Sequence, residues 1–146
     1  MAVPITFTVG APATREALGA LLALEQHLGE PVGAIVATAL GAPARAAGDP
    51  DALIRTVAVC GGAGDSLLGA VARLGVDAYV TGDLRHHPVD EHLRAGGPAV
   101  VDAGHWGTEF PWCATVAELL WPYLDVAVHD APTDPFTVRS APTADA

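Results

Sequence analysis

The stretch Val57-Ala-Val-Cys-Gly-Gly-Ala-Gly-Asp-Ser66 decides the fold class, because it joins an apolar run to a glycine-rich segment and then to polar residues. Its first four residues have the length and the apolar side chains of a buried strand. The glycine-rich segment that follows predicts a tight turn, and Asp65 or Ser66 predicts the cap of a helix that runs to Leu74. A strand, a turn and a helix in this order form the repeating unit of an α/β layered domain.

The same order of elements recurs along the chain. We expect further strands over residues 5–9, 78–81, 100–102 and 124–128. We expect further helices over residues 13–28, 32–40, 88–94 and 108–120, and a loop of small residues over 42–51. Strands that alternate with helices predict an α/β fold with a layered, largely parallel sheet, in which the loops at the carboxyl ends of the strands carry function.

Composition limits the classes of partner. At 146 residues, the chain has room for one domain with a hydrophobic core. Seven basic residues, all of them arginine, against seventeen acidic residues give a formal net charge of −10 at pH 7. A surface this acidic repels phosphate backbones and anionic membranes. We therefore expect neither a nucleic-acid partner nor a membrane partner.

Cysteine usage and the lengths of the apolar runs predict a cytoplasmic location. Cys60 and Cys113 form no Cys-x-x-Cys pair, and we expect both to be reduced, buried thiols. No apolar run reaches the roughly eighteen residues that a membrane span needs. The first residues lack the basic segment and the long apolar core of a signal peptide.

His105 and Glu109 lie four residues apart, directly after a predicted strand. If a helix begins just after Gly104, the imidazole and the carboxylate lie one turn apart on the same helix face. Side chains of these two kinds bind divalent metal ions. A hydrogen-bonded pair at a helix start is the alternative interpretation, and spacing by itself does not decide between the two. Three aromatic residues would form a partly dry wall beside the pair, Trp106, Phe110 and Trp112.

A second polar cluster follows the strand predicted over residues 78–81. Arg85 is placed to hold an anionic substrate group or, alternatively, to pair with Asp83. Adjacent histidines point in different directions, so we expect His87, rather than both His86 and His87, to face a shared site.

Two further features allow a functional and a structural interpretation. Gly62 and Gly64 could present backbone N–H groups to a phosphate, although the lysine of a P-loop and the spacing of a dinucleotide fingerprint are both missing. Glycines that let a strand pack closely against a helix are the alternative. Glu91 and His92 are expected on a solvated helix face.

Three segments in order, residues 57–66, 79–87 and 101–109, resemble the carboxyl-terminal half of the GTP cyclohydrolase 1 type 2 homologue family, also called the Nif-three-like dinuclear-metal proteins. The resemblance runs from about Glu30 to about Asp130. It implies a Nif-three-like α/β domain over residues 30–130. An amino-terminal segment without a clear match, residues 1–29, would precede this domain, and a flexible tail, residues 131–146, would follow it.

The resemblance also implies a site. It makes His105 and Glu109 metal ligands and places His87 in the same cleft, with zinc, iron, manganese and magnesium not distinguished. The family's other ligands come from an amino-terminal half, so we expect an incomplete dinuclear site here. The resemblance implies a metal-dependent hydrolase acting on a nucleotide-like anionic substrate within a homo-oligomer, a ring-like hexamer. The alternative is a non-enzymatic oligomeric scaffold or binding module that retains the fold.

Overall fold

The computed structural model describes residues 6–9 and 32–138, so the helix predicted over residues 13–28 lies outside the described part of the chain. The strands are β1 (Thr6–Val9), β2 (Arg45–Ala47), β3 (Thr56–Ala63), β4 (Ala78–Gly82) and β5 (Ala99–Asp102). The helices are α2 (Val32–Leu40), the 3-10 helix η2 (Asp65–Leu67), α3 (Leu68–Val71), α4 (His86–Arg94), α5 (His105–Glu109) and α6 (Pro111–Leu120).

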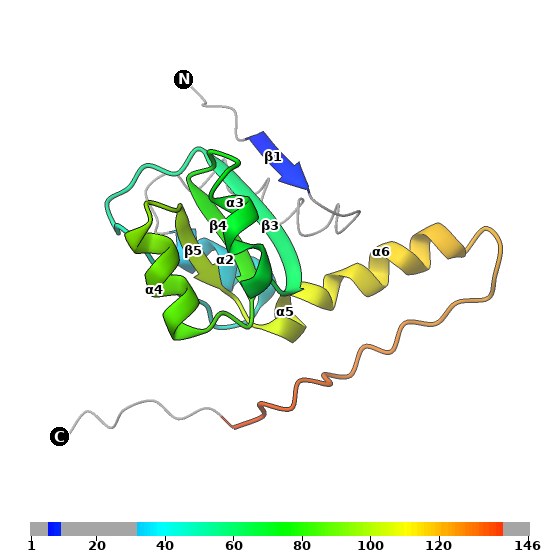
Figure 1. Cartoon of the computed structure of the whole chain (residues 1–146). Helices are drawn as coiled ribbons and strands as arrows, with labels where there is room; N and C mark the ends of the chain where they lie inside the picture. Colours follow the sequence, from blue (N-terminus) through cyan, green and yellow to red (C-terminus); the bar gives the residue numbers. More distant parts are fainter. Residues whose placement is uncertain (1–5, 10–31, 139–146) are drawn as a thin grey trace.

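The five strands form one sheet in the order β1-β3-β4-β5-β2 (Figure 1). The strands β1, β3, β4 and β5 run parallel to one another, and β2 pairs antiparallel with β5 at the edge. Every residue of the central strand β4 is buried, because helices cover both faces of the sheet. The predicted fold class, a layered and largely parallel α/β sheet, is confirmed.

Alternate residues of the strands enter two cores on opposite faces of the sheet. On one face, Val36 of α2 packs with Val80 and Val101. On the other face, Leu68 of α3 packs with Tyr79, and Val89 of α4 packs against the same cluster. Since successive side chains of a strand point to opposite faces, the apolar run of β4 supplies both cores at once. These two layers hold the carboxyl ends of the strands in place.

The glycine-rich segment differs from the prediction. The strand β3 continues through Ala63, so no tight turn follows Cys60, and the pairing with β4 shifts register between Val59 and Ala63. The N-cap of η2 is Gly64, so Asp65 and Ser66 lie inside this helix, and the carboxylate of Asp65 accepts hydrogen bonds from the guanidinium of Arg85. The helix that follows is short, since α3 ends at Val71.

Three other predicted elements change form. Residues 45–47 of the expected loop form β2, because they add to the free edge of β5. No strand forms over residues 124–128, which follow a turn at 121–123 and pair with none of the described strands. The helix expected over 108–120 begins earlier, at His105, and is divided into α5 and α6 before Pro111, which has no N–H group to donate.

His92 and the cysteines also correct expectations. His92 is buried, with Nε2 3.0 Å from the carbonyl oxygen of Pro98, and a Cβ on Gly97 would collide with its ring. The close approach of that glycine backbone is what makes room for the imidazole. Both cysteines are free, but only Cys60 is partly buried, because Cys113 lies on the exposed side of α6.

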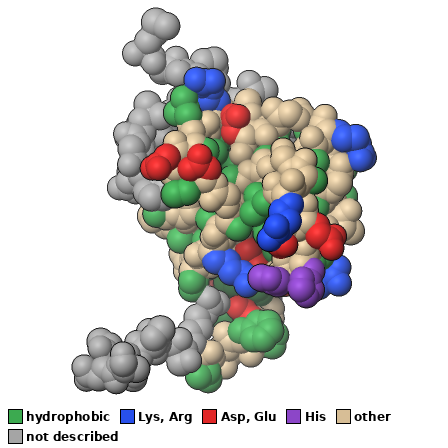
Figure 2. Space-filling view, turned by 60° about the vertical axis from the view of Figure 1, so that its left-hand side comes forward, with side chains coloured by type: hydrophobic (Ala, Val, Ile, Leu, Met, Phe, Trp, Pro, Cys, Tyr) green, Lys and Arg blue, Asp and Glu red, His purple; other side chains and the backbone are tan. Residues whose placement is uncertain are grey.

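The surface shown in Figure 2 mixes acidic, basic and histidine side chains, and no large basic patch occupies this face. Within residues 6–9 and 32–138, no helix has both the length and the apolar character needed to cross a membrane. The cytoplasmic location stays a prediction.

Asp77 ties the start of β3 to the start of β4. Its Oδ2 accepts hydrogen bonds from the N–H of Thr56 at 2.7 Å, the hydroxyl of Thr56 at 2.9 Å and the N–H of Arg55 at 2.9 Å. Burial raises the pKa of Asp77, but these hydrogen bonds favour the ionised form and together hold the pKa below its ordinary value. Ionised Asp77 therefore stabilises the folded protein.

Replacing Asp77 by alanine should lower the free energy of unfolding by about 1–3 kcal/mol at neutral pH, measured by urea denaturation. Because the pKa of Asp77 is lower in the folded state, its contribution is present above the unfolded pKa and is lost as pH falls through the folded pKa. The difference in free energy of unfolding between wild type and Asp77→Ala should therefore shrink in acid. Asp125→Ala, at an exposed position, is the matched control. A gap that stays constant into acid would contradict this role.

Candidate functional site

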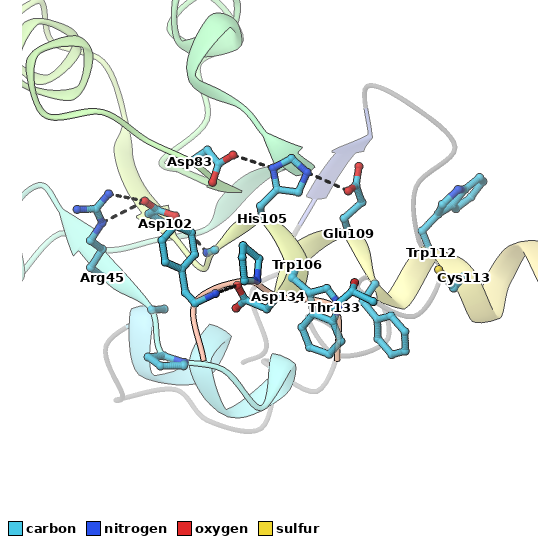
Figure 3. Close-up of a pocket in the computed structure, with 16 residues that line it drawn as sticks. Arg45, Asp83, Asp102, His105, Trp106, Glu109, Trp112, Cys113, Thr133 and Asp134 are labelled. Atoms are coloured by element: carbon cyan, nitrogen blue, oxygen red, sulfur yellow. Dashed lines mark hydrogen bonds and ion pairs between the residues drawn. The ribbon is translucent and has the colours of Figure 1, made fainter. Parts of the chain in front are cut away.

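The ends of β4 and β5 bring the predicted histidine–glutamate pair together with a second acidic residue (Figure 3). Nε2 of His105 lies 3.0 Å from Oε2 of Glu109, one turn further along α5. On the other side of the ring, Nδ1 lies 2.7 Å from Oδ2 of Asp83, which directly follows β4. The imidazole is thus held between two carboxylates, and all three side chains are about half exposed.

The two carboxylates change the acidity of the imidazole. The hydrogen bond to Asp83 raises the pKa of His105, partial burial lowers it, and the charges of Glu109 and Asp83 raise it further, so the net shift is upward. A protonated ring can donate from both nitrogens at once. A metal ion bound at Nε2 would take the place of the proton that the ring shares with Glu109.

The backbone of β3 crosses directly over this pair at Gly62. Gly62 has a φ of +70°, and a Cβ there would lie 3.1 Å from Oε1 of Glu109 and 3.3 Å from Nε2 of His105. Its N–H donates to the hydroxyl of Thr108 at 2.9 Å. Gly62 therefore leaves room for the two side chains, and its amide is not directed at a ligand.

Gly64 has the same structural role further along the chain. Its N–H donates to the carbonyl oxygen of Gly82 at 3.1 Å, and a Cβ would collide with the side chains of Thr81 and Tyr79. The geometry favours close packing, the alternative that the sequence left open, over a phosphate cradle.

A pocket of about 1060 Å³ opens beside the pair. Its polar lining comes from Arg45, Asp83, Asp102, His105 and Glu109 (Figure 3). Its apolar lining includes the expected aromatic wall, Trp106, Phe110 and Trp112, together with Pro135 and Phe136, and Thr133 and Asp134 add further polar groups. The rings of Trp106 and Phe110 stack with centroids 4.6 Å apart. The pocket thus joins a charged end to a flat, apolar wall.

Arg85 and His87 do not line this pocket. The guanidinium of Arg85 is exposed and pairs with Asp65, with Nε 2.8 Å from Oδ2, rather than with Asp83. His87 is exposed on α4, where its ring contacts that of His86 at a centroid distance of 5.1 Å. The chain turns away from the pocket after Asp83, so these side chains are not brought to the pair.

Sequence reasoning missed two residues that brace the site. Oδ2 of Asp102 accepts hydrogen bonds from Nη2 of Arg45 at 2.7 Å and from the N–H of Leu84 at 3.2 Å. Its Oδ1 accepts one from the N–H of Gly104 at 3.1 Å. Asp102 could have been recognised as a site residue, because it is a carboxylate at the end of a predicted strand. The sequence gives no such indication for Arg45, because its segment is predicted to be a loop.

The donor set at this site is of the right chemistry for a divalent metal ion, but it is small. Within the described parts of the chain, no group of three or more His, Cys, Asp or Glu side chains is arranged to hold a metal ion. The site offers two donors, Nε2 of His105 and the carboxylate of Glu109. Among the described residues no third ligand joins them, because Asp83 contacts the other ring nitrogen. The residues present therefore fit part of a metal site.

Replacing Gly62 by alanine tests whether the β3 backbone must lie against the pair. Gly75→Ala is a matched control, because Gly75 has a φ of +69° and no atom lies within 4 Å of the place that a Cβ would take. Both variants carry left-handed strain of about 1–2 kcal/mol, but only Gly62→Ala also presses on His105 and Glu109. We expect a larger loss of stability in urea, and shifted His105 ring signals by NMR, for Gly62→Ala alone. Equal effects in the two variants would contradict the contact.

Comparisons with known proteins agree with this architecture. The family model described as Duf34/NIF3 (NGG1p interacting factor 3) matches residues 10–135. A Mycobacterium tuberculosis protein named GTP cyclohydrolase 1 type 2 homolog is 57% identical over 98 residues, which cover 64% of this chain and 26% of that protein. A protein of the same name from Streptomyces coelicolor is 53% identical over 113 residues, which cover 70% of this chain and 39% of that protein.

A comparison with solved structures also finds a similar protein. The Staphylococcus aureus protein SA1388 superposes with a TM-score of 0.65 at 26% identity, over 75% of this chain and 39% of that one. The chain thus corresponds to between about a quarter and two fifths of the length of these relatives. Because the family model covers most of the sequence, the chain belongs to the Duf34/NIF3 family.

Proposed function

We propose that this chain binds a divalent metal ion through His105 and Glu109 and contributes half of a metal-dependent hydrolytic site. One observation carries the proposal. Nε2 of His105 and Oε2 of Glu109 face each other at the pocket, 3.0 Å apart, and Asp83 contacts the other ring nitrogen. A carboxylate that holds the second nitrogen of a ligating histidine is typical of metal sites. Nitrogen and oxygen donors suit zinc, iron, manganese and magnesium.

When bound, a divalent ion would supply Lewis acidity that lowers the pKa of a water molecule to near neutrality. The chain's own residues would provide the surroundings. Asp83 holds the imidazole, and the stacked rings of Trp106 and Phe110 exclude water from one wall of the pocket. We propose a small, nucleotide-like anion as substrate, because a flat aromatic wall suits a planar base and the relatives carry the name GTP cyclohydrolase 1 type 2 homolog.

Two protein donors seldom hold a metal ion tightly, since structural and catalytic sites use three or four. The chain matches only 26% to 39% of the length of its relatives. We therefore propose that the remaining ligands come from residues outside this chain, and that the chain binds metal weakly when it is studied alone.

Titration of the purified chain with Co²⁺ or Zn²⁺, followed by calorimetry, tests the metal site. Wild type should bind weakly, and His105→Ala and Glu109→Ala should each reduce affinity by about 10-fold or more, because each removes one donor. The control is His86→Ala, which removes an exposed histidine of α4 outside the pocket. Wild-type binding no stronger than that of His105→Ala would refute the proposal.

A second candidate function is a homo-oligomeric scaffold or binding module without catalysis. Exposed apolar side chains at and beyond the end of α6 favour it, with Leu119 63%, Trp121 59%, Tyr123 82% and Leu124 59% exposed. In Figure 1 this end of α6 extends away from the sheet. We propose that these residues contact another copy of the chain, in a hexamer if the family resemblance extends to assembly.

Self-association is tested by sedimentation of the purified chain at micromolar concentration. Wild type should sediment above the mass of one subunit, and Trp121→Ser with Leu124→Ser should shift it toward a single subunit, because apolar contact area is lost. Leu53→Ser is the control, since Leu53 is 66% exposed on another part of the surface. A single-subunit mass for wild type would count against the scaffold.

A further inference from the structure

Asp83 has a backbone conformation that few residues other than glycine adopt. Its φ is +55°, and it is the one non-glycine residue with a positive φ among residues 6–9 and 32–138. Aspartate tolerates this conformation better than most residues, but it remains strained. Such strain persists where the surrounding structure imposes it, and it concentrates at functional sites.

The residue after Asp83 is held at three points. The side chain of Leu84 is 5% exposed and packs in the core beneath α3 and α4. Its N–H donates to Oδ2 of Asp102 at 3.2 Å, and its carbonyl oxygen accepts from Nη2 of Arg45 at 2.7 Å. With both backbone polar groups and the side chain of Leu84 held, the chain at Asp83 has little freedom to relax.

The same carboxylate holds the segment that carries the histidine. Oδ1 of Asp102 accepts a hydrogen bond from the N–H of Gly104, the residue before His105. The two segments also touch directly, since a Cβ on Gly82 would lie 2.6 Å from the carbonyl carbon of Gly104. Asp102 therefore sets the position of Asp83 relative to His105 from both sides.

We propose that Asp83 is a positioning residue, whose strained backbone brings its carboxylate to Nδ1 of His105 so that this nitrogen keeps the proton and Nε2 faces Glu109 and the pocket. Figure 3 shows the ring between the two carboxylates in this orientation. The consequence for metal affinity rests on the proposed metal-binding function, whereas the orientation of the ring does not. A simple surface ion pair would not require a strained backbone or a buried frame around it.

Two substitutions distinguish the role of the Asp83 carboxylate from that of its backbone conformation. Asp83→Gly removes the carboxylate and accepts the positive φ without strain. Asp83→Asn keeps the shape, but its amide N–H₂ can donate to Nδ1 and so favour the opposite tautomer. Asp125→Asn is the matched control, because it removes an exposed carboxylate outside the pocket.

The first measurement is the ¹⁵N spectrum of the imidazoles in metal-free protein, at a pH where the His105 ring is neutral. Wild type and Asp125→Asn should show the Nδ1–H tautomer of His105, and Asp83→Gly should show a mixture or the Nε2–H tautomer. The second measurement is the Co²⁺ affinity of the same proteins, which should fall by about 10- to 100-fold in Asp83→Gly and remain at the wild-type value in Asp125→Asn.

The two measurements distinguish the positioning role from the metal-binding role. If wild type binds no Co²⁺ but the tautomer changes in Asp83→Gly, the positioning role stands and the proposed metal function fails. If Asp83→Gly keeps the wild-type tautomer, the positioning role is overturned, whether or not affinity falls. A fall in affinity with an unchanged tautomer would make Asp83 a direct ligand instead.

Discussion

The carboxylate of Asp102 is the group on which the arrangement of the site depends. Its side chain is only 10% exposed, and it accepts four hydrogen bonds, from Nε and Nη2 of Arg45 and from the N–H groups of Leu84 and Gly104. These donors come from three segments that are distant in sequence. Charge-assisted hydrogen bonds in a partly desolvated position are stronger than neutral ones, so one side chain fixes the three segments relative to one another. Asp83 and His105 meet because their neighbours share this acceptor.

Glycines provide the second constraint on the site. Because they have no side chain, the backbone at these positions can pack directly against another segment where the two cross. Gly62 lies against His105 and Glu109, and Gly82 lies against Gly104. A side chain at either position would push the segments apart. The same close packing uses the N–H groups of Gly62 and Gly64 inside the protein, which explains why a glycine-rich segment after a strand does not act as an anion cradle here.

Local features of the sequence predicted much of this fold and the centre of its site. The apolar runs of β3, β4 and β5 are long enough to be recognised as buried strands, and the helix α2 has the predicted bounds. The spacing of His105 and Glu109 places them on one helix face by helical geometry alone. Predictions failed where the outcome depended on a distant partner. Residues 45–47 joined the sheet by pairing along the edge of β5, whereas residues 124–128 pair with none of the described strands.

The sequence by itself determined the class of fold, the strand ends at which polar residues gather, and the facing of an imidazole and a carboxylate one helical turn apart. Those properties follow from short-range periodicity, which any segment carries within itself. Only the tertiary structure decided the partners of the charged side chains. Asp83 pairs with His105, and Arg85 pairs with Asp65, although the sequence allowed Arg85 and Asp83 to pair with each other. Several such pairings have similar energies in an isolated chain, and the packing of Leu84 and the shared acceptor Asp102 select one of them.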